Sequence, residues 1–274
     1  MSSQSQKPIL AISLKLYFSP NQTLRYLETL ASLTTRSTTS SRLSSSDLPL
    51  RFIFIPDFLT LSNCSTSFTT PTSGIHYAAQ DGHWEDQGPW TGEVSMRSLR
   101  EVGCEYVELG HAERRKHFGE TDEIVVKKCC AAIRNGLVPI ICIGEPTETD
   151  TTSAIKVLES QLDAVLRSTS VEDELVLAYE PVWAIGQPVA APVAHIVAMG
   201  HALRRLIGHS GRGGGQVKVM YGGSAGPGMW AQIRGAVDGL FLGRFAHEIG
   251  NVKLIMGEME AGLKEDEREQ RAMG

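Results

Sequence analysis

Residues 174–186 read E-L-V-L-A-Y-E-P-V-W-A-I-G, and this stretch organises the rest of the chain. Its apolar run from Leu175 to Ala178 has the length and composition of a strand buried on both faces. Glu180 follows, and a carboxylate at the carboxyl end of a buried strand is unfavourable unless it has a task. The apolar residues that lead to Gly186 are typical of a loop that closes over a site and excludes water. The alternative is a strand-end glutamate paired with a lysine and followed by a packed loop.

The same unit recurs along the chain: a short apolar run, a turn marked by Gly or Pro, and a segment with helical periodicity. The apolar runs lie at residues 9–13, 52–56, 75–80, 106–110, 138–144, 175–180, 217–223 and 239–243. Helical segments include residues 121–136, 192–209 and 250–263. Alternating strands and helices predict a parallel sheet, and eight such units predict that the sheet closes. The predicted fold class is therefore α/β, a single (β/α)8 TIM barrel.

The length of the chain fits one such barrel. It has 274 residues, of which 42% are hydrophobic and 21% are charged, as in a globular protein with a full core. We therefore expect one domain over residues 1–274. Three segments fall outside the repeating unit: a polar N-terminal extension (1–8), a Ser- and Thr-rich surface loop (34–47) and a charged C-terminal tail (264–274) at a fraying helix end.

Composition also limits the partners and the location of the protein. The net charge of −5 gives no electrostatic reason to expect nucleic acid or an anionic membrane as a partner. The cysteines are odd in number, five in all, and lack CxxC spacing, so neither a disulfide framework nor a zinc site is indicated. Neither a signal peptide nor a run long enough to span a bilayer is visible in the sequence, and we expect a cytoplasmic protein.

In a barrel of this kind the chemistry lies on the loops after the strands. Those positions hold the carboxylate of Glu180, the imidazole of His111 and the ammonium group of Lys15. Proton transfer next to a carbonyl requires such groups, because one abstracts the proton while the others stabilise the enediolate. The turns after the last two runs hold glycines that fit an anion such as phosphate, at Gly222, Gly223 and Gly243. The pattern needs neither a metal nor another cofactor, and we expect none.

Five motifs carry a specific resemblance. They are T-G-E-V-S (91–95), G-H-A-E-R-R (110–115), C-I-G-E (142–145), A-Y-E-P-V-W-A-I-G (178–186) and Y-G-G-S (221–224). In this order and spacing they resemble the motifs of the triosephosphate isomerase family, and the resemblance runs from about Ile9 to about Met259. It implies the roles established for that family, with Glu180 as catalytic base and His111 as a neutral electrophile.

The resemblance implies further roles around these two residues. Lys15 is the positive group that faces the substrate oxyanion, and Glu113 is a supporting carboxylate. Residues 181–191 form the closing lid. The backbone amides that hold the phosphate belong to Gly186, Ser224, Gly243 and Arg244. Loop 82–90 has the length of the family's loop that inserts into a second subunit, which implies a homodimer. Trp84 and Trp90 flank that loop, either as interface anchors or packed within the loop itself.

The departures from the family pattern lie around the substrate. Ser13 stands where the family has an asparagine, so a shorter hydroxyl replaces an amide that helps to hold the substrate and leaves more room. Pro188 lies at the far hinge of the lid, where a proline fixes φ and stiffens the backbone. Arg244 stands in the last phosphate-binding turn, where the family has a glycine pair. Its side chain either contacts the phosphate through a charge-assisted hydrogen bond or points to solvent.

Three functions are compatible with this sequence. The first is the cofactor-independent interconversion of dihydroxyacetone phosphate and glyceraldehyde 3-phosphate through an enediolate. The second is the same chemistry on a four-carbon ketose phosphate such as erythrulose phosphate, and the changes at Ser13, residues 187–189 and Arg244 favour it. The third is a barrel that binds phosphorylated sugars without catalysis. The presence of Lys15, His111 and Glu180 argues against this last alternative.

Overall fold

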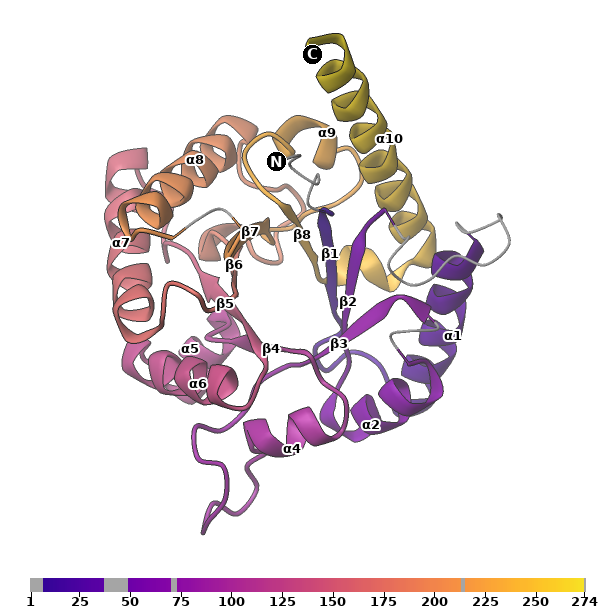
Figure 1. Ribbon diagram of the computed structural model, residues 1–274, viewed down its shortest axis with the longest axis vertical. Helices are drawn as coiled ribbons and strands as arrows, with labels where there is room; N and C mark the ends of the chain where they lie inside the picture. The colour runs from indigo at the N-terminus through magenta and orange to yellow at the C-terminus, as the bar shows by residue number, and fades with distance from the viewer. Residues whose placement is uncertain (1–6, 37–48, 70–72, 213–214, 274) are drawn as a thin grey trace.

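The strands of the protein close into a barrel, which confirms the predicted fold class. The computed structural model describes residues 7–36, 49–69, 73–212 and 215–273. All neighbouring strands are parallel, and the order runs from β1 to β8, with β8 pairing back onto β1 (Figure 1). The strands are β1 (Ile9–Ser13), β2 (Arg51–Ile55), β3 (Ile75–Ala79), β4 (Tyr106–Leu109), β5 (Val138–Ile143), β6 (Leu175–Tyr179), β7 (Val217–Tyr221) and β8 (Gly239–Leu242).

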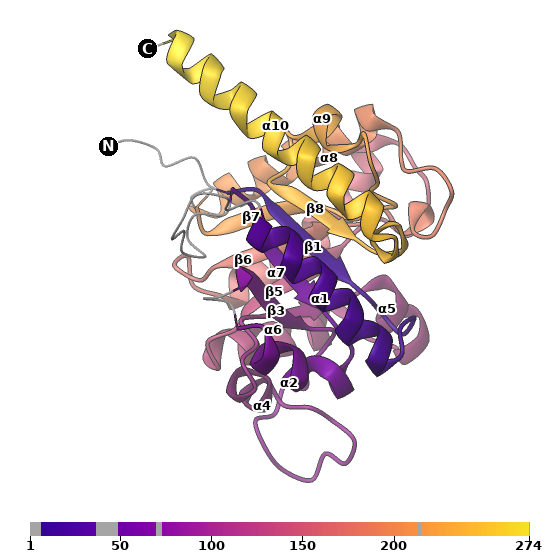
Figure 2. The same cartoon turned by 90° about the vertical axis from the view of Figure 1, so that its right-hand side faces the viewer.

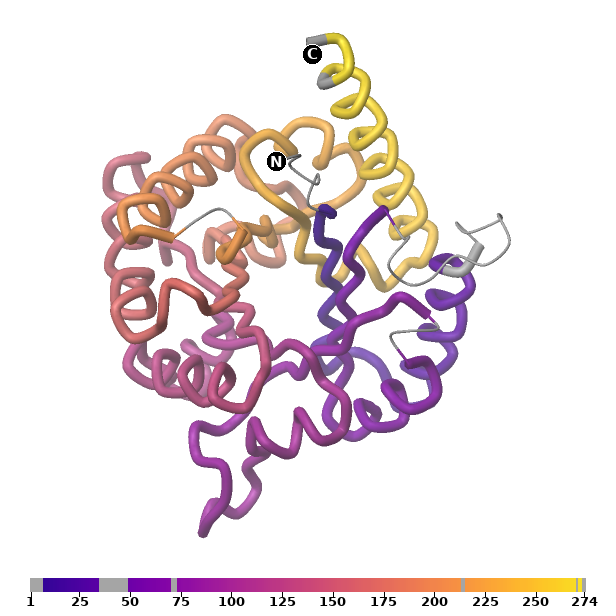
Figure 3. The backbone as a smooth tube through the Cα atoms, in the orientation of Figure 1, coloured from indigo at the N-terminus to yellow at the C-terminus, as the bar shows by residue number. Residues whose placement is uncertain are grey.

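The helices form a ring around this barrel, as the backbone tube shows (Figure 3). They are α1 (Pro20–Arg36), α2 (Phe58–Ser67), α4 (Met96–Glu101), α5 (Ala112–Phe118), α6 (Asp122–Arg134), α7 (Thr151–Ser168), α8 (Val193–His209), α9 (Trp230–Ile233) and α10 (Ile249–Met273), with 3-10 helices η2 (Val182–Ala184) and η3 (Arg244–His247). The helices α2, α6 and α7 begin after N-cap residues Asp57, Thr121 and Asp150, respectively. The side chain of each N-cap residue accepts a hydrogen bond from a backbone N–H group of the first helical turn. Within the ranges described above, the helices lack the combination of length and apolarity that a membrane crossing needs.

Side chains alternate along each strand between two separate cores. One set packs between the barrel and the helices, and includes Leu10, Ile12 and Val107. The other fills the barrel interior, and includes Ile9, Ala11 and Tyr106 among others. By the same alternation, the residues two positions further along β1 and β4 also point into the interior.

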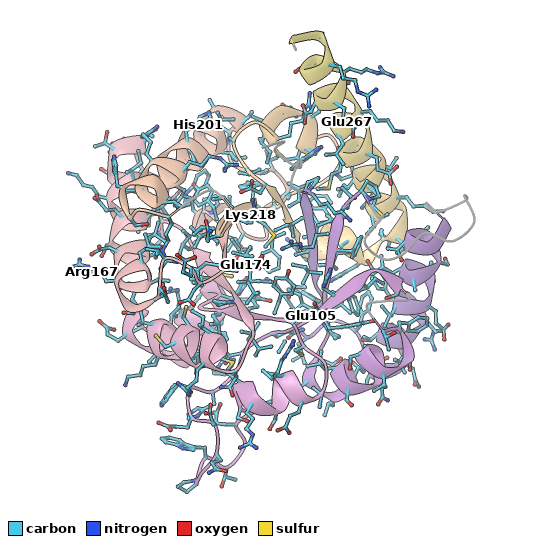
Figure 4. All side chains as sticks on the ribbon, in the orientation of Figure 1. Glu105, Arg167, Glu174, His201, Lys218 and Glu267 are labelled. Carbon is cyan, nitrogen blue, oxygen red and sulfur yellow. The ribbon has the colours of Figure 1, made fainter. Side chains whose placement is uncertain are left out.

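Charged side chains mark the amino-terminal end of the barrel. Arg51 Nη1 lies 2.8 Å from Glu174 Oε1 and 3.2 Å from the hydroxyl of Tyr106. Figure 4 labels Glu174 and Lys218 near the barrel axis in this view. These groups lie at the start of β2, β6 and β7, so they belong to the end of the barrel opposite to the loops that follow the strands.

The last helix is longer than the sequence indicated. One face of the predicted helical segment 250–263 packs on the core, where Val252, Ile255 and Met259 are buried. The charged segment that we expected to fray continues as part of α10 to Met273, and Figure 2 shows this end of the helix projecting past the barrel. Arg234 explains the start of this extension, since its guanidinium binds Glu265 at 2.9 Å and also contacts Asp266. The predicted loop 34–47 begins inside α1, and its residues 37–48 lie outside the described ranges.

The loop between β3 and α4 protrudes from the barrel (Figures 1 and 2). Its aromatic rings pack on one another: the ring centroid of His83 lies 4.2 Å from that of Trp84 and 4.5 Å from that of Trp90. Trp90 nevertheless keeps 44% of its surface exposed. The rings therefore pack within the loop, and the role of the two tryptophans as interface anchors stays a prediction. The homodimer through loop 82–90 stays a prediction.

Candidate active site

A cavity of about 570 Å³ opens where the strands end. Most of the predicted site residues line it, together with apolar and polar residues of the lid and of the β8 turn. The lining includes Ser13, Lys15, Tyr17, Glu113, Glu180, Ile185, Gly186, Gln187, Pro188, Gly222, Ser224, Phe241, Gly243, Arg244 and Glu248. His111 lies beside this cavity, against Glu180. The fold therefore gathers all the predicted site residues at the carboxyl end of the barrel.

Glu180 and His111 face one another across a short gap. Oε2 of Glu180 lies 3.5 Å from Nε2 of His111, and both side chains are buried. Neither of these two atoms has a hydrogen-bond partner among the described residues. Buried polar atoms without a partner are unfavourable, so the presence of two such atoms side by side points to a ligand that both contact. Gly222 allows this placement, because a Cβ atom there would lie 2.6 Å from Oε1 of Glu180.

The tautomer of His111 follows from its other nitrogen. The backbone N–H of Glu113 donates to Nδ1 of His111 at 3.2 Å, at the start of α5. A nitrogen that accepts a hydrogen bond carries no proton, so the neutral imidazole carries its proton on Nε2. That N–H points toward the gap beside Glu180, where it can donate to a carbonyl oxygen.

Lys15 supplies the positive charge of the site. Its backbone has φ of 50°, a conformation that L-residues rarely adopt, and its Nζ lies 2.9 Å from Oε1 of Glu113. Burial lowers the pKa of Lys15, but the hydrogen bond to Glu113 and the charges of Glu180, Glu113 and Glu108 outweigh it and raise the pKa. The ammonium group therefore stays charged at the cavity wall. The predicted supporting role of Glu113 agrees with this contact.

The lid is anchored on the side of β5 and β6. Nε1 of Trp183 donates to Oε1 of Glu145 at 2.8 Å, and the hydroxyl of Tyr179 lies 3.2 Å from both oxygens of Glu145. Nε2 of His195, at the start of α8, lies 3.0 Å from the same carboxylate. Glu145 is fully buried, so these partners satisfy a carboxylate that would otherwise be costly.

The opposite side of the lid rests on the β7 and β8 turns. Oγ of Ser224 lies 2.9 Å from the carbonyl oxygen of Ala184 and 3.1 Å from that of Gln187. The guanidinium of Arg244 donates to the carbonyl oxygen of Gly186. This contact adds to the two alternatives that the sequence left open for Arg244, because the exposed side chain also contacts the predicted lid. It also lines the cavity, so the same guanidinium borders the expected phosphate position.

Replacement of Arg244 by methionine is expected to lower kcat/KM for a phosphorylated substrate about tenfold. The change removes a charge-assisted hydrogen bond to Gly186 and a positive charge at the cavity, while it keeps much of the side-chain volume. Steady-state kinetics, with inorganic phosphate as a competitive inhibitor, measure both effects. Arg244→Lys is the control, because it keeps the charge without the planar fork. If KM and the phosphate inhibition constant are both unchanged in Arg244→Met, Arg244 does not contribute to phosphate binding.

Sequence reasoning missed Glu108 on β4. Its side chain points into the barrel and is 3% exposed, and Oγ of Ser13 donates to its Oε2 at 2.9 Å. The signal was present, because Glu108 interrupts an apolar run that was itself expected to be buried. The predicted extra room at Ser13 is therefore only part of the finding: this hydroxyl is held by a second buried carboxylate.

Comparison with known proteins agrees with this geometry. The sequence model of the family described as "Triosephosphate isomerase" matches residues 8–259. The chain is 44% identical over 257 residues to an L-erythrulose-1-phosphate isomerase of Pectobacterium atrosepticum. This alignment covers 93% of this chain and 96% of the relative. It is 41% identical over 221 residues to an enzyme of the same name from Rhizobium etli, covering 78% of this chain and 80% of the relative.

The match includes every segment that forms the site. It begins just before β1, which ends in Ser13, and it extends into α10, beyond the turn that carries Arg244. The five motifs of the sequence lie within it and include Glu180, His111, much of the predicted lid and the turn after β7. Sequence, fold and site therefore agree that this chain belongs to the triosephosphate isomerase family.

Proposed function

We propose that the protein isomerises L-erythrulose 1-phosphate by moving its carbonyl group to the neighbouring carbon. The observation that carries this proposal is the 44% identity, over nearly the whole of both chains, to a relative that bears this activity in its name. Family membership supports a sugar-phosphate isomerase in general, and the named relatives favour the four-carbon substrate over the triose phosphates.

The chemistry of this substrate fits the groups in the cavity. L-erythrulose 1-phosphate contains the unit of dihydroxyacetone phosphate, with a hydroxymethyl group in place of one hydrogen on C3. Removal of the C3 proton gives an enediolate across C2 and C3. Return of a proton to C2, with the hydroxyl proton passing from O3 to O2, leaves the carbonyl at C3. The product is again a ketose phosphate, because C1 carries the phosphate and cannot become an aldehyde by this route.

Each step has a candidate residue. Oε2 of Glu180 takes the proton from C3 and returns it to C2. The Nε2–H of His111 donates to the oxygens of the enediolate. In the structure this Nε2 lies 3.5 Å from Oε2 of Glu180. The ammonium group of Lys15 stabilises the developing negative charge. The backbone amides of Gly186, Ser224, Gly243 and Arg244 bind the phosphate as part of this proposal.

The decisive experiment compares two substrates on the full chain. We expect kcat/KM for L-erythrulose 1-phosphate to exceed that for dihydroxyacetone phosphate at least tenfold, with NMR following the position of the carbonyl. In D2O, deuterium enters the product at C2, because the carboxylate exchanges its proton with solvent. Preference for the triose overturns the proposal in favour of triosephosphate isomerisation. Turnover of neither substrate, with inorganic phosphate still binding, favours the non-catalytic barrel.

A further inference from the structure

Glu108 is a buried carboxylate that the proposed mechanism does not use. It lies on β4 in the same alternation as Tyr106, which fills the barrel interior. Burial of an ionisable carboxyl group is unfavourable, and burial raises the pKa of Glu108 to about 7, with the charge of Glu180 adding to the rise and those of His111 and Lys15 opposing it. An apolar residue at this position would avoid the cost of burying an ionisable group. The presence of a carboxylate here therefore suggests a functional role.

A hydrogen bond of this side chain crosses the barrel. Oγ of Ser13, at the end of β1, donates its proton to Oε2 of Glu108 at 2.9 Å. Ser13 lines the cavity, whereas Glu108 lies behind it and does not. The direct contact of Glu108 with the cavity wall is therefore made through the Ser13 hydroxyl, while its charge also acts on Lys15 and Glu180.

The direction of this hydrogen bond decides what Ser13 offers the cavity. A serine hydroxyl has one proton to donate and two lone pairs that accept. When Glu108 is ionised, its carboxylate can only accept, so the Ser13 proton is directed to it and only lone pairs remain for a ligand. An acceptor of this kind forms a hydrogen bond with the hydroxyl group of a ligand. A ligand that has a carbon-bound hydrogen in the same place forms no such hydrogen bond.

The proposed substrate has such a donor at the matching end. In the proposed binding mode its phosphate is held at the turns of Gly186, Ser224 and Gly243, and its reacting carbons lie between Glu180 and His111. The terminal C4 hydroxyl is the group farthest from the phosphate, so in this mode it extends toward the part of the cavity wall that includes Ser13. Dihydroxyacetone phosphate lacks this hydroxymethyl group.

We propose that Glu108 is a positioning residue that orients the Ser13 hydroxyl as an acceptor for the C4 hydroxyl, and that this pair sets the preference for a tetrulose over a triose phosphate. The inference rests on the proposed function and adds to it the residues that determine specificity. A site built to bind a hydroxyl discriminates strongly against an analogue that lacks it, because its own polar groups are then left unpaired.

The test measures the ratio of kcat/KM for L-erythrulose 1-phosphate to that for dihydroxyacetone phosphate. Ser13→Ala and Glu108→Leu are expected to lower the ratio about 10- to 100-fold. Glu108→Gln keeps an oxygen that accepts from Ser13, so it is expected to restore part of the ratio. Glu174→Gln removes a carboxylate at the opposite end of the barrel and serves as the control, with an unchanged ratio.

A double variant separates positioning from a general structural role. If Glu108 acts through Ser13, the ratio in Ser13→Ala/Glu108→Leu equals that in Ser13→Ala alone. Should leucine prevent folding, the smaller Glu108→Ala, which also removes the acceptor, replaces it in the same cycle. Two results overturn this inference alone. In the first, Ser13→Ala keeps the wild-type preference for the tetrulose. In the second, the change of the ratio in the double variant is the product of the changes in the two single variants. Absence of any tetrulose preference in the wild type overturns the proposed function instead.

Discussion

Glu180→Gln is expected to lower kcat for isomerisation by up to about 10⁴-fold, with KM changed much less. The amide has the shape of the carboxylate, so Gly222 still accommodates it and the cavity keeps its volume. It cannot take a proton from carbon, and the group that faces Nε2 of His111 loses its charge. Single-turnover kinetics and the incorporation of deuterium from D2O measure the loss directly.

Glu180→Asp is the matched control for this change. It keeps the charge but withdraws the carboxylate from the reacting carbon by the length of one methylene group, so an intermediate loss is expected. Both variants should bind inorganic phosphate as the wild type does, as measured by the shift of the thermal unfolding temperature with phosphate. A Glu180→Gln enzyme that keeps more than a tenth of wild-type kcat shows that another group is the base.

The fold could be predicted because each strand carries its own signal. The run at Leu175 is apolar throughout, as expected for a strand between barrel interior and helices, and β6 lies there. The predicted runs extend one or two residues past several observed ends, as at Gly222 and Gly223 after β7. Those glycines have the apolar neighbours of a strand but lie in the turn that approaches Glu180 and Pro181. Local sequence identifies an element more reliably than its last residue.

The contacts across the site were less predictable. Ser13 and Glu108 are 95 residues apart and lie on strands that are not neighbours in the barrel. Alternation places each in the interior, but which interior residues meet depends on the stagger of the closed barrel, which no local pattern specifies. Arg244 shows a second limit. Its contact with Gly186 depends on the path of the β8 turn and on the position of the lid together.

A cluster of buried charges outside the cavity lies between α6 and the loops after β3 and β4. Nζ of Lys128 lies 2.8 Å from each oxygen of Asp81 and 2.5 Å from Oε1 of Glu120. Arg114 binds the same two carboxylates. Lys128, Asp81 and Glu120 are all buried. Sequence reasoning did not find this cluster, because its members come from separate segments.

Lys128→Met is expected to lower the free energy of unfolding by about 3–5 kcal/mol. The substitution keeps an unbranched side chain in the core but leaves Asp81 and Glu120 facing one another with Arg114 as their remaining cation. Urea denaturation measures the loss, and Lys156→Met, on the exposed face of α7, should stay within about 0.5 kcal/mol of the wild type. Asp81→Asn and Glu120→Gln added to Lys128→Met should recover part of the stability, because no unpaired carboxylate then remains buried. A loss below about 1 kcal/mol in Lys128→Met is the result expected of an exposed ion pair, and it would mean that water reaches the cluster and screens its charges.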